Sequence, residues 1–292
     1  TLSSDFQTIP DMMDALYSCG VGGPVTMNIQ GGTHNGYMHF DGPILGASAT
    51  NTVTINGAAG WANTIIIHDG TGANGNAVVA FNGVSYITVQ NLTLQNTGTN
   101  DSWGALFTNN ATYNNLMNNR IDMYHTTNVF DVIGVVFAAS FTNDFQEGNN
   151  GSFNLVQGND ITGGEMGIHV EGSSAQRNKY NRFIDNQIHG ADDYGMYIDD
   201  QDSLEIIGNR IYDLQTATFN YGIYCFDIMD FDISRNQVTA YTYGVYISDG
   251  NFDATPQRRG KFINNMIQFY NTYGVYFSDV RARLFIPLLM AK

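Results

Sequence analysis

Tyrosine and aspartate recur together in one repeated block of this chain, and side chains of these types could bind or cleave a ligand. The block reads Tyr-Gly-apolar-Tyr-x-x-Asp. Repeated blocks stack on one another in repeat folds, so equivalent residues form rows along the molecule. We therefore expect a row of tyrosines beside a row of aspartates. The four copies are residues 194–200, 221–227, 243–249 and 273–279, with a looser copy at 166–171.

The aspartates of this row could supply an acid and a base for hydrolysis. Carboxylates one or two stacked strands apart would be separated by roughly 5–10 Å, a range that includes retaining and inverting glycosidases. One carboxyl would have to keep its proton to act as the acid, which requires a raised pKa. A polysaccharide hydrolase is therefore one hypothesis for this surface. Its candidate catalytic residues are Asp199, Asp200, Asp227 and Asp249.

The tyrosines suggest binding. If Ile168, Met196 and their equivalents point inward, alternation sends the next residue of each strand outward. Exposed aromatic rings beside hydrogen-bonding carboxylates suit an uncharged sugar chain. The predicted glycan-binding residues are His169, Tyr197, Tyr224, Tyr246 and Tyr276.

Both rows also have a purely structural interpretation. Aromatic pairs stabilise neighbouring strands in any sheet, and aspartate is a common turn residue. The sequence leaves the structural and the functional interpretation open.

A third hypothesis concerns metal binding. Several carboxylates cluster within one repeat, and Ca²⁺ takes six to eight oxygen ligands. The spacing is not that of a recognised calcium loop, and a solvated acidic surface is the alternative. No other cofactor is indicated. The candidate Ca²⁺ ligands are Asp192, Asp193, Asp199, Asp200 and Asp202.

A second repeat indicates the elements that position these residues. It reads apolar-x-x-Asn-x-Ile/Val, and it alternates with the tyrosine block. A unit of about 25 residues with short strands and no helical period is one coil of a parallel β-helix. We expect asparagine to occupy a left-handed turn and to form a hydrogen-bonded ladder. The repeated asparagines are Asn119, Asn159, Asn186, Asn209, Asn236 and Asn265.

The fold class predicted is therefore all-β, a right-handed parallel β-helix with three parts. Residues 5–19 have an amphipathic helical pattern, so residues 1–22 are expected to cap the open end of the coils. Residues 23–280 are expected to form the β-helix, with loop insertions near 143–152 and between 249 and 261. Residues 281–292 lack both repeats, which predicts a cap or a truncated end with apolar surface for self-association.

The amino-acid composition limits the classes of partner that the protein could bind. The formal net charge is −15, which argues against nucleic acid and anionic membranes. No apolar run approaches the ~20 residues of a membrane span. Cys225 is expected to be a buried apolar filler, and neither it nor Cys19 belongs to a disulfide or metal pattern. Low charge with abundant Asn and Thr favours a secreted or cell-surface protein.

The N-terminal part resembles known families. Residues 5–9, 23–29 and 31–35 are similar to the start of pectinesterase-like β-helices. Residues 44–55 and 84–94 resemble large secreted β-helix surface proteins of the type IX secretion pathway. These resemblances imply a pectin lyase-like solenoid exported from the cell, and the missing sorting domain implies a fragment of a longer protein.

Complete catalytic sets of carbohydrate-active β-helix families are absent. The pectinesterase-like run at residues 201–204 lacks a second element and a matching arginine. The polygalacturonase Asp-Asp pair at 199–200 stands alone, with His169 before it. A lyase base is missing, because the arginines in the asparagine repeat lie away from the tyrosine block. The sequence therefore favours a non-catalytic extracellular or cell-surface module for adhesion or for binding a polysaccharide or cell-surface glycan, with the hydrolase as the alternative.

Overall fold

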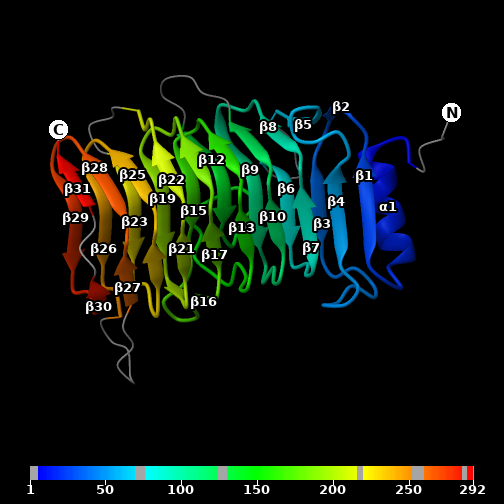
Figure 1. Cartoon of the computed structure of the whole chain (residues 1–292). Coiled ribbons are helices and arrows are strands. Elements are labelled where there is room, and N and C mark those ends of the chain that lie inside the picture. The colour runs from blue at the N-terminus through cyan, green and yellow to red at the C-terminus, as the bar shows by residue number, and fades with distance from the viewer. Residues whose placement is uncertain are drawn as a thin grey trace.

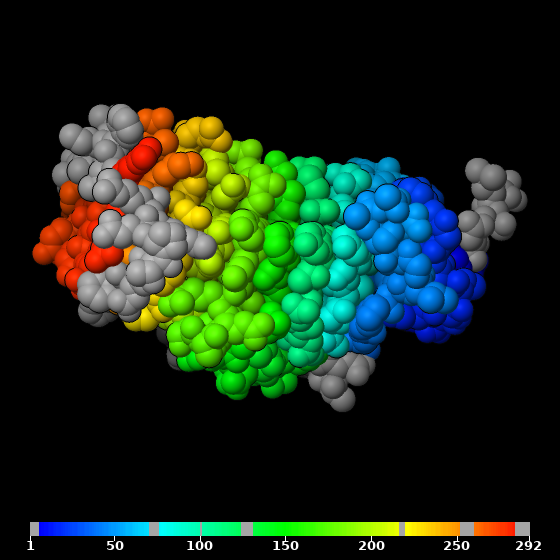
Figure 2. Space-filling model, turned by 90° about the horizontal axis from the view of Figure 1, so that it is seen from below, coloured from blue at the N-terminus to red at the C-terminus, as the bar shows by residue number. Residues whose placement is uncertain are grey.

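Short parallel strands coil into an elongated right-handed β-helix (Figure 1). The computed structural model describes residues 6–69, 76–123, 130–215, 220–251, 260–284 and 288–291. Each coil contributes one strand to each of three parallel sheets, here called sheets A, B and C. The colour sequence along the molecule in Figure 2 follows the chain order, so each coil contacts mainly its two neighbours. The predicted fold class is confirmed.

Within the described ranges, sheets A and B each contain ten strands. The strands of sheet A are β1 (Val25–Ile29), β4 (Val53–Gly57), β7 (Ile87–Gln90), β10 (Asn115–Met117), β13 (Leu155–Gln157), β17 (Arg182–Ile184), β21 (Glu205–Ile207), β24 (Asp232–Ser234), β27 (Gly260–Ile263) and β30 (Ala282–Leu284). Those of sheet B are β2 (Gly32–Asn35), β5 (Thr64–His68), β8 (Thr93–Asn96), β11 (Arg120–Met123), β14 (Asp160–Thr162), β18 (Gln187–His189), β22 (Arg210–Tyr212), β25 (Gln237–Ala240), β28 (Met266–Phe269) and β31 (Leu288–Ala291).

Sheet C carries the tyrosine blocks. Its strands in the described part of the chain are β3 (Met38–Asp41), β6 (Ala77–Asn82), β9 (Asn100–Thr108), β12 (Phe130–Phe137), β15 (Met166–Val170), β19 (Tyr194–Asp199), β23 (Tyr221–Phe226), β26 (Tyr243–Ser248) and β29 (Tyr273–Ser278). A short additional sheet pairs β16 (Asn178–Lys179) with β20 (Gln201–Asp202).

The glycine of the tyrosine block is required by close packing between sheets. A Cβ added to Gly195 would lie 2.5 Å from the carbonyl oxygen of Gly222 and 2.5 Å from the Cγ2 atom of Ile211. The equivalent glycines in neighbouring coils meet the same two kinds of atom. Any side chain here would collide with sheet B. The glycine therefore recurs in each block because sheets C and B approach too closely to leave room for a Cβ atom.

The predicted asparagine ladder is confirmed, although its turn differs from the prediction. The six asparagines are buried, and each of the first five donates from its backbone N–H and its side chain to Oδ1 of the next, at 2.9–3.2 Å. The left-handed conformation belongs to the preceding residue, which varies among Asn, Gly, Asp and Arg. The ladder asparagine is selected for hydrogen bonding inside the solenoid. A second ladder joins Asn114, Asn154 and Asn181.

Helix α1 (Ile9–Cys19) lies against the first coil, as Figure 1 shows. It begins later than the predicted residue 5, because the Thr8 side chain caps it and exchanges hydrogen bonds with Asp11. Its buried residues, Ile9, Met12 and Leu16, join the core of the solenoid.

The coils continue beyond the predicted boundary at residue 280. Strands β30 and β31 pair in parallel with β27 and β28 and add a tenth strand to sheets A and B. The buried position of Cys225 in β23 agrees with its expected role as a filler. Among the described residues, no helix is both long and apolar enough to cross a membrane.

Candidate functional site: a tyrosine face and a carboxylate cluster

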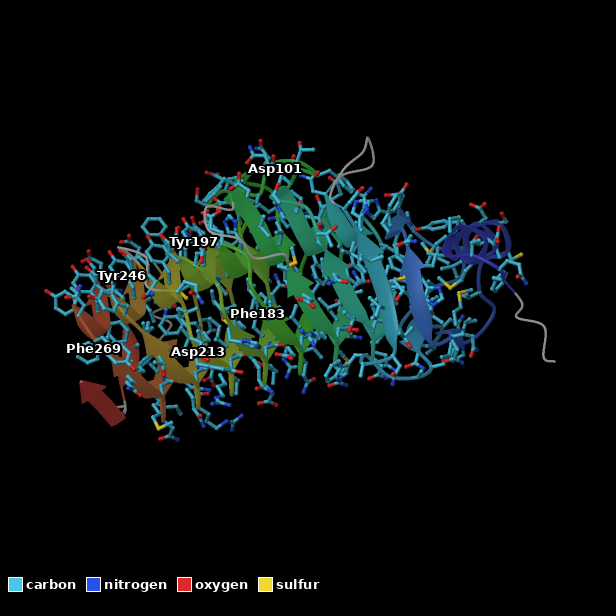
Figure 3. All side chains as sticks on the ribbon, turned by 90° about the horizontal axis from the view of Figure 1, so that it is seen from above. Asp101, Phe183, Tyr197, Asp213, Tyr246 and Phe269 are labelled. Atoms are coloured by element: carbon cyan, nitrogen blue, oxygen red, sulfur yellow. The ribbon has the colours of Figure 1, made fainter. Side chains whose placement is uncertain are left out.

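Two rows of tyrosines cover the outer side of sheet C over four successive coils. We call them together the Tyr face. The outer side of each strand carries the first and fourth residues of the block, whereas Met196, Ile223 and Val245 are fully buried. Figure 3 shows Tyr197 and Tyr246 projecting from the same side of the solenoid. The first row is Tyr194, Tyr221, Tyr243 and Tyr273, and the second is Tyr197, Tyr224, Tyr246 and Tyr276.

Within each row the rings are stacked in register. Successive ring centroids lie 4.8–5.6 Å apart in the first row and 4.9–5.0 Å apart in the second. In the first three coils the rings of the two rows meet nearly at right angles, at 84–89°, and in the last coil Tyr273 and Tyr276 are tilted at 52°. Parallel rings at this centroid spacing are offset, so each leaves part of its face uncovered by the next ring.

Burial keeps the hydroxyl groups of Tyr194, Tyr197 and Tyr224 protonated. Burial raises the pKa of Tyr194 and of Tyr224 to about 12, with smaller contributions from neighbouring tyrosines and carboxylates. Burial and the charge of Glu171 also raise the pKa of Tyr197. The surface therefore offers regularly spaced uncharged donors and acceptors next to partly apolar rings.

His169 was predicted to lie on the exposed row, and this placement is wrong. It pairs in register with Tyr197, but it is fully buried beneath the predicted insertion around residues 143–152. The Phe145 ring packs edge-on against the imidazole with centroids 4.6 Å apart. The row of outward-facing, partly exposed side chains therefore begins at Tyr197.

The buried imidazole holds the insertion onto sheet C. His169 Nδ1 lies 2.8 Å from Asp144 Oδ2, and Nε2 lies 3.1 Å from Glu171 Oε2. Burial alone would lower the pKa of His169, but hydrogen bonds and the charges of the two carboxylates outweigh it and raise the pKa. The protonated imidazole can thus donate to both carboxylates.

Carboxylates gather at the end of sheet C next to Tyr197, and we call this group the carboxylate cluster: Glu171, Asp199, Asp200 and Asp227. Asp200 and Asp227 directly follow the paired residues Asp199 and Phe226, so their Cα atoms are about 4.8 Å apart. Arg177 bridges the two coils. Its guanidinium donates to the side chain and, at 3.4 Å, to the carbonyl oxygen of Asp227, and its Nε lies 3.9 Å from Asp200 Oδ1.

Two carboxyls of the cluster hold protons near neutral pH. Burial, followed by the charges of Asp200 and Glu171, raises the pKa of Asp199 to about 7. Burial, followed by the hydrogen bond and charge of Asp227, raises the pKa of Asp200 to about 7, although Arg177 opposes the shift. One buried oxygen of each, Oδ1, accepts no hydrogen bond from the described residues. Such groups can donate a proton to a ligand.

Asp249, the fourth candidate catalytic residue, lies one coil beyond Asp227 and accepts a hydrogen bond from Ser248 at 3.1 Å. Asp200, Asp227, Asp249 and Asp279 all have a positive φ of 44–55°. These aspartates therefore also serve the left-handed turns that follow β19, β23, β26 and β29, as the structural interpretation of the row holds.

The predicted metal site does not form. Asp192 and Asp193 precede strand β19, whereas Asp199 and Asp200 end it, and six residues of extended strand span roughly 20 Å. Within the described ranges, no three His, Cys, Asp or Glu side chains come together in an arrangement that could hold a metal ion. These aspartates are close together in the sequence, but strand β19 holds them far apart in space.

Three members of this region were not found by sequence reasoning. Asp144, Glu171 and Arg177 come from different coils and loops. Only the fold brings Asp144 and Glu171 to His169, and Arg177 to Asp200 and Asp227. The first tyrosine row was also missed. The repeat itself contained the signal for that row, because Tyr194 and its equivalents recur as regularly as Tyr197.

Comparison with known proteins agrees with this architecture. A family model described as "right handed beta helix region" matches residues 123–284. No curated protein matches the chain.

Solved structures share the fold at low identity. PfbA, a surface adhesin of Streptococcus pneumoniae, is 12% identical with a TM-score of 0.50, over 94% of this chain and 88% of its own. A GH136 lacto-N-biosidase from Eubacterium ramulus is 10% identical with a TM-score of 0.50, over 96% of this chain and 64% of its own. Pectin methylesterase PemA from Erwinia chrysanthemi is 13% identical with a TM-score of 0.45, over 94% and 78%.

At such identities these likenesses describe the fold alone. The family match covers more than half of the chain and coincides with coils that carry the tyrosine blocks. The chain belongs to the right-handed β-helix region family.

Proposed function

We propose that the protein is an extracellular module that binds a neutral polysaccharide or cell-surface glycan, without cleaving it, through the Tyr face. The observation that supports this proposal is the pair of stacked tyrosine rows over four coils. A sugar ring has apolar faces and a hydroxyl rim, so it can contact an offset aromatic ring and a phenolic hydroxyl together.

Charge favours an uncharged ligand. The net charge is −15, and so large a negative charge disfavours the binding of a uronate chain. The tyrosines repeat once per coil along the solenoid. We infer that the glycan lies along the axis of the solenoid and contacts several coils, as repeated sugar units would allow.

A glycan array with a double variant, Tyr197→Ala/Tyr224→Ala, tests this proposal. Two lost ring contacts of roughly 0.5–1.5 kcal/mol each should weaken binding about 10-fold. Tyr241→Ala is the matched control, because Tyr241 is 38% exposed but belongs to neither row. Equal binding by the double variant and the control would reject the Tyr face as the binding surface.

A hydrolase is the second candidate, and the carboxylate cluster supports it. Asp199 or Asp200, with pKa values of about 7, would act as the general acid, and Asp227 would act as the base or nucleophile. Glycans that bind in the array would be incubated with the protein and assayed for new reducing ends. Cleavage that is abolished by Asp200→Asn or Asp227→Asn would replace the binding proposal with the hydrolase.

The proposal also requires that the protein is exported from the cell. A module that binds polysaccharide or cell-surface glycan has to reach the cell exterior, and the N-terminal resemblance points to the type IX pathway. Cell fractionation of the native host tests this, with the protein expected at the surface or in the medium and not in the cytoplasm.

A further inference from the structure

A third stack of aromatic rings lies outside the Tyr face, on the turns that lead into sheet A. We call it the turn strip: Tyr86, Tyr113, Phe153 and Tyr180. These residues shortly precede β7, β10, β13 and β17, in four successive coils. Their ring centroids are 5.3, 4.7 and 4.9 Å apart, and the planes of successive rings differ by 6–19°.

Three rings of the turn strip face solvent, and the fourth, Tyr86, is partly exposed. Tyr113, Phe153 and Tyr180 are 45%, 41% and 49% exposed, among the largest values for apolar side chains in the described chain. Folding therefore leaves much of their apolar area in water, and packing inside the protein does not account for these residue types.

The backbone conformation makes these residue types more unusual. All four have a positive φ of 57–66°, a region that bulky side chains rarely adopt. Strain of this kind gathers at ligand-binding positions. The stacked rings offset part of it through their mutual contacts.

The turn itself does not require a ring. The same position of the next two coils is held by Ser203 and Asp230, which have φ values of 56° and 49°. Small polar residues thus make the same left-handed turn one and two coils further along. The aromatic side chains are an addition to the turn, confined to four coils.

Three of the four residues directly before the strip residues are neutral and polar, and the fourth, Lys179, is an exposed cation. Ser85 and Thr112, each directly before a strip residue, are 2.8 Å apart and hydrogen-bonded. The side chain of Asn115 donates to Thr88 at 3.0 Å along the adjoining strands. Aromatic rings flanked by hydroxyl and amide groups suit a neutral sugar chain, whereas a protein partner would favour one anchor residue in a dry pocket.

We propose that the turn strip is a second binding site for a neutral glycan, which would lie along the solenoid axis and contact one ring per coil. The strip lies on other coils and another side of the β-helix than most of the Tyr face, so the two sites are independent. Together they would let one molecule hold two glycan chains, or two segments of one chain, and raise its avidity.

Affinity gel electrophoresis tests the strip with defined probes: xyloglucan, mixed-linkage β-glucan, galactomannan and, as an anionic comparison, alginate. The variant is Tyr113→Gly/Phe153→Gly, because glycine removes the rings and also relieves the left-handed strain. The matched control is Ser203→Gly/Asp230→Gly, at the same turn position without a ring. Chemical denaturation is expected to show the strip variant folded as stably as the wild type.

We expect at least one neutral polymer to retard the wild type and the control to the same extent. The apparent affinity of the strip variant for that polymer should be at least 5-fold lower. Retardation that survives the Tyr197→Ala/Tyr224→Ala variant and disappears in the strip variant would identify the strip separately from the Tyr face. Binding of every neutral polymer without loss in the strip variant, or no binding by the wild type, would overturn the second site.

Discussion

Replacing Asn209 by alanine removes the centre of the main asparagine ladder. The Asn209 Oδ1 atom accepts from the backbone N–H and the side chain of Asn186, each at 3.0 Å. Its Nδ2 donates to the carbonyl oxygen of Phe183 at 2.8 Å and to Asn236 Oδ1 at 3.1 Å. All of these groups are buried in the solenoid, so water cannot easily replace the lost partner.

The expected loss follows from the groups left unpaired. Alanine would orphan two donors of Asn186 and the carbonyl acceptor of Phe183, while Asn236 would keep its bond from the backbone. Each buried unsatisfied group costs about 1–3 kcal/mol, and partial relaxation reduces the sum. We predict that Asn209→Ala lowers the free energy of unfolding by roughly 3–6 kcal/mol.

Urea unfolding followed by far-UV circular dichroism measures this loss. The control is Asn271→Ala, because Asn271 is exposed, and surface changes usually stay within about 0.5 kcal/mol. The slope of each transition must be compared, since repeat proteins can unfold in parts. A change in Asn209→Ala no larger than in the control would refute the reasoning that the ladder holds the coils together.

Two further perturbations test the packing and the charges. Gly195→Ala places a methyl group 2.5 Å from Ile211 and should destabilise the fold by about 1–3 kcal/mol. The control, Gly22→Ala, should leave stability unchanged, because no atom lies within 4 Å of the added methyl group. Equal melting temperatures of the two variants would disprove the packing requirement. Asp199 and Asp200 have folded-state pKa values of about 7, above the ordinary value of 3.8. Between these values the folded state binds more protons, so their contribution to stability is present below about pH 4 and is lost as pH rises to about 7. The double variant Asp199→Asn/Asp200→Asn should therefore lose less stability than the wild type across this range in urea titrations; identical pH profiles would show that the two carboxyls titrate normally.

The repeated blocks made the fold predictable, because each coil repeats the same inward and outward positions. Because the strands of sheet C pair in register, Tyr197, Tyr224, Tyr246 and Tyr276 were predicted to form one row, and they do. The ladder asparagines were also identified, but the left-handed residue was misplaced by one position. It varies from coil to coil and so leaves no repeat to follow.

The first tyrosine row was missed because the alternation of sheet C is interrupted at glycine. In β19 both Gly195 and Met196 are buried, so Tyr194 and Tyr197 face outward although they are three residues apart. A strict period of two would place Tyr194 inside. The same reasoning applies to each block with a glycine in this position.

The rest of the site depends on contacts between distant segments. His169 has the sequence position of an exposed residue, yet Asp144 and Phe145 cover it from a loop 24–25 residues earlier. Arg177 reaches Asp227, 50 residues later, across two coils. Local patterns contain no information on where an irregular loop will fold, so these partners required the structure.

The most direct test of the Tyr face as a glycan-binding surface is the dissociation constant of a neutral oligosaccharide series, titrated by calorimetry. The series would come from the strongest neutral hit of the array, with the wild type, the Tyr197→Ala/Tyr224→Ala variant and Tyr241→Ala compared. We predict that affinity rises with chain length until the ligand spans the four coils, and that the double variant binds the longest member about 10-fold more weakly. A dissociation constant that is the same in all three proteins would contradict the account and leave the tyrosine rows as part of the scaffold.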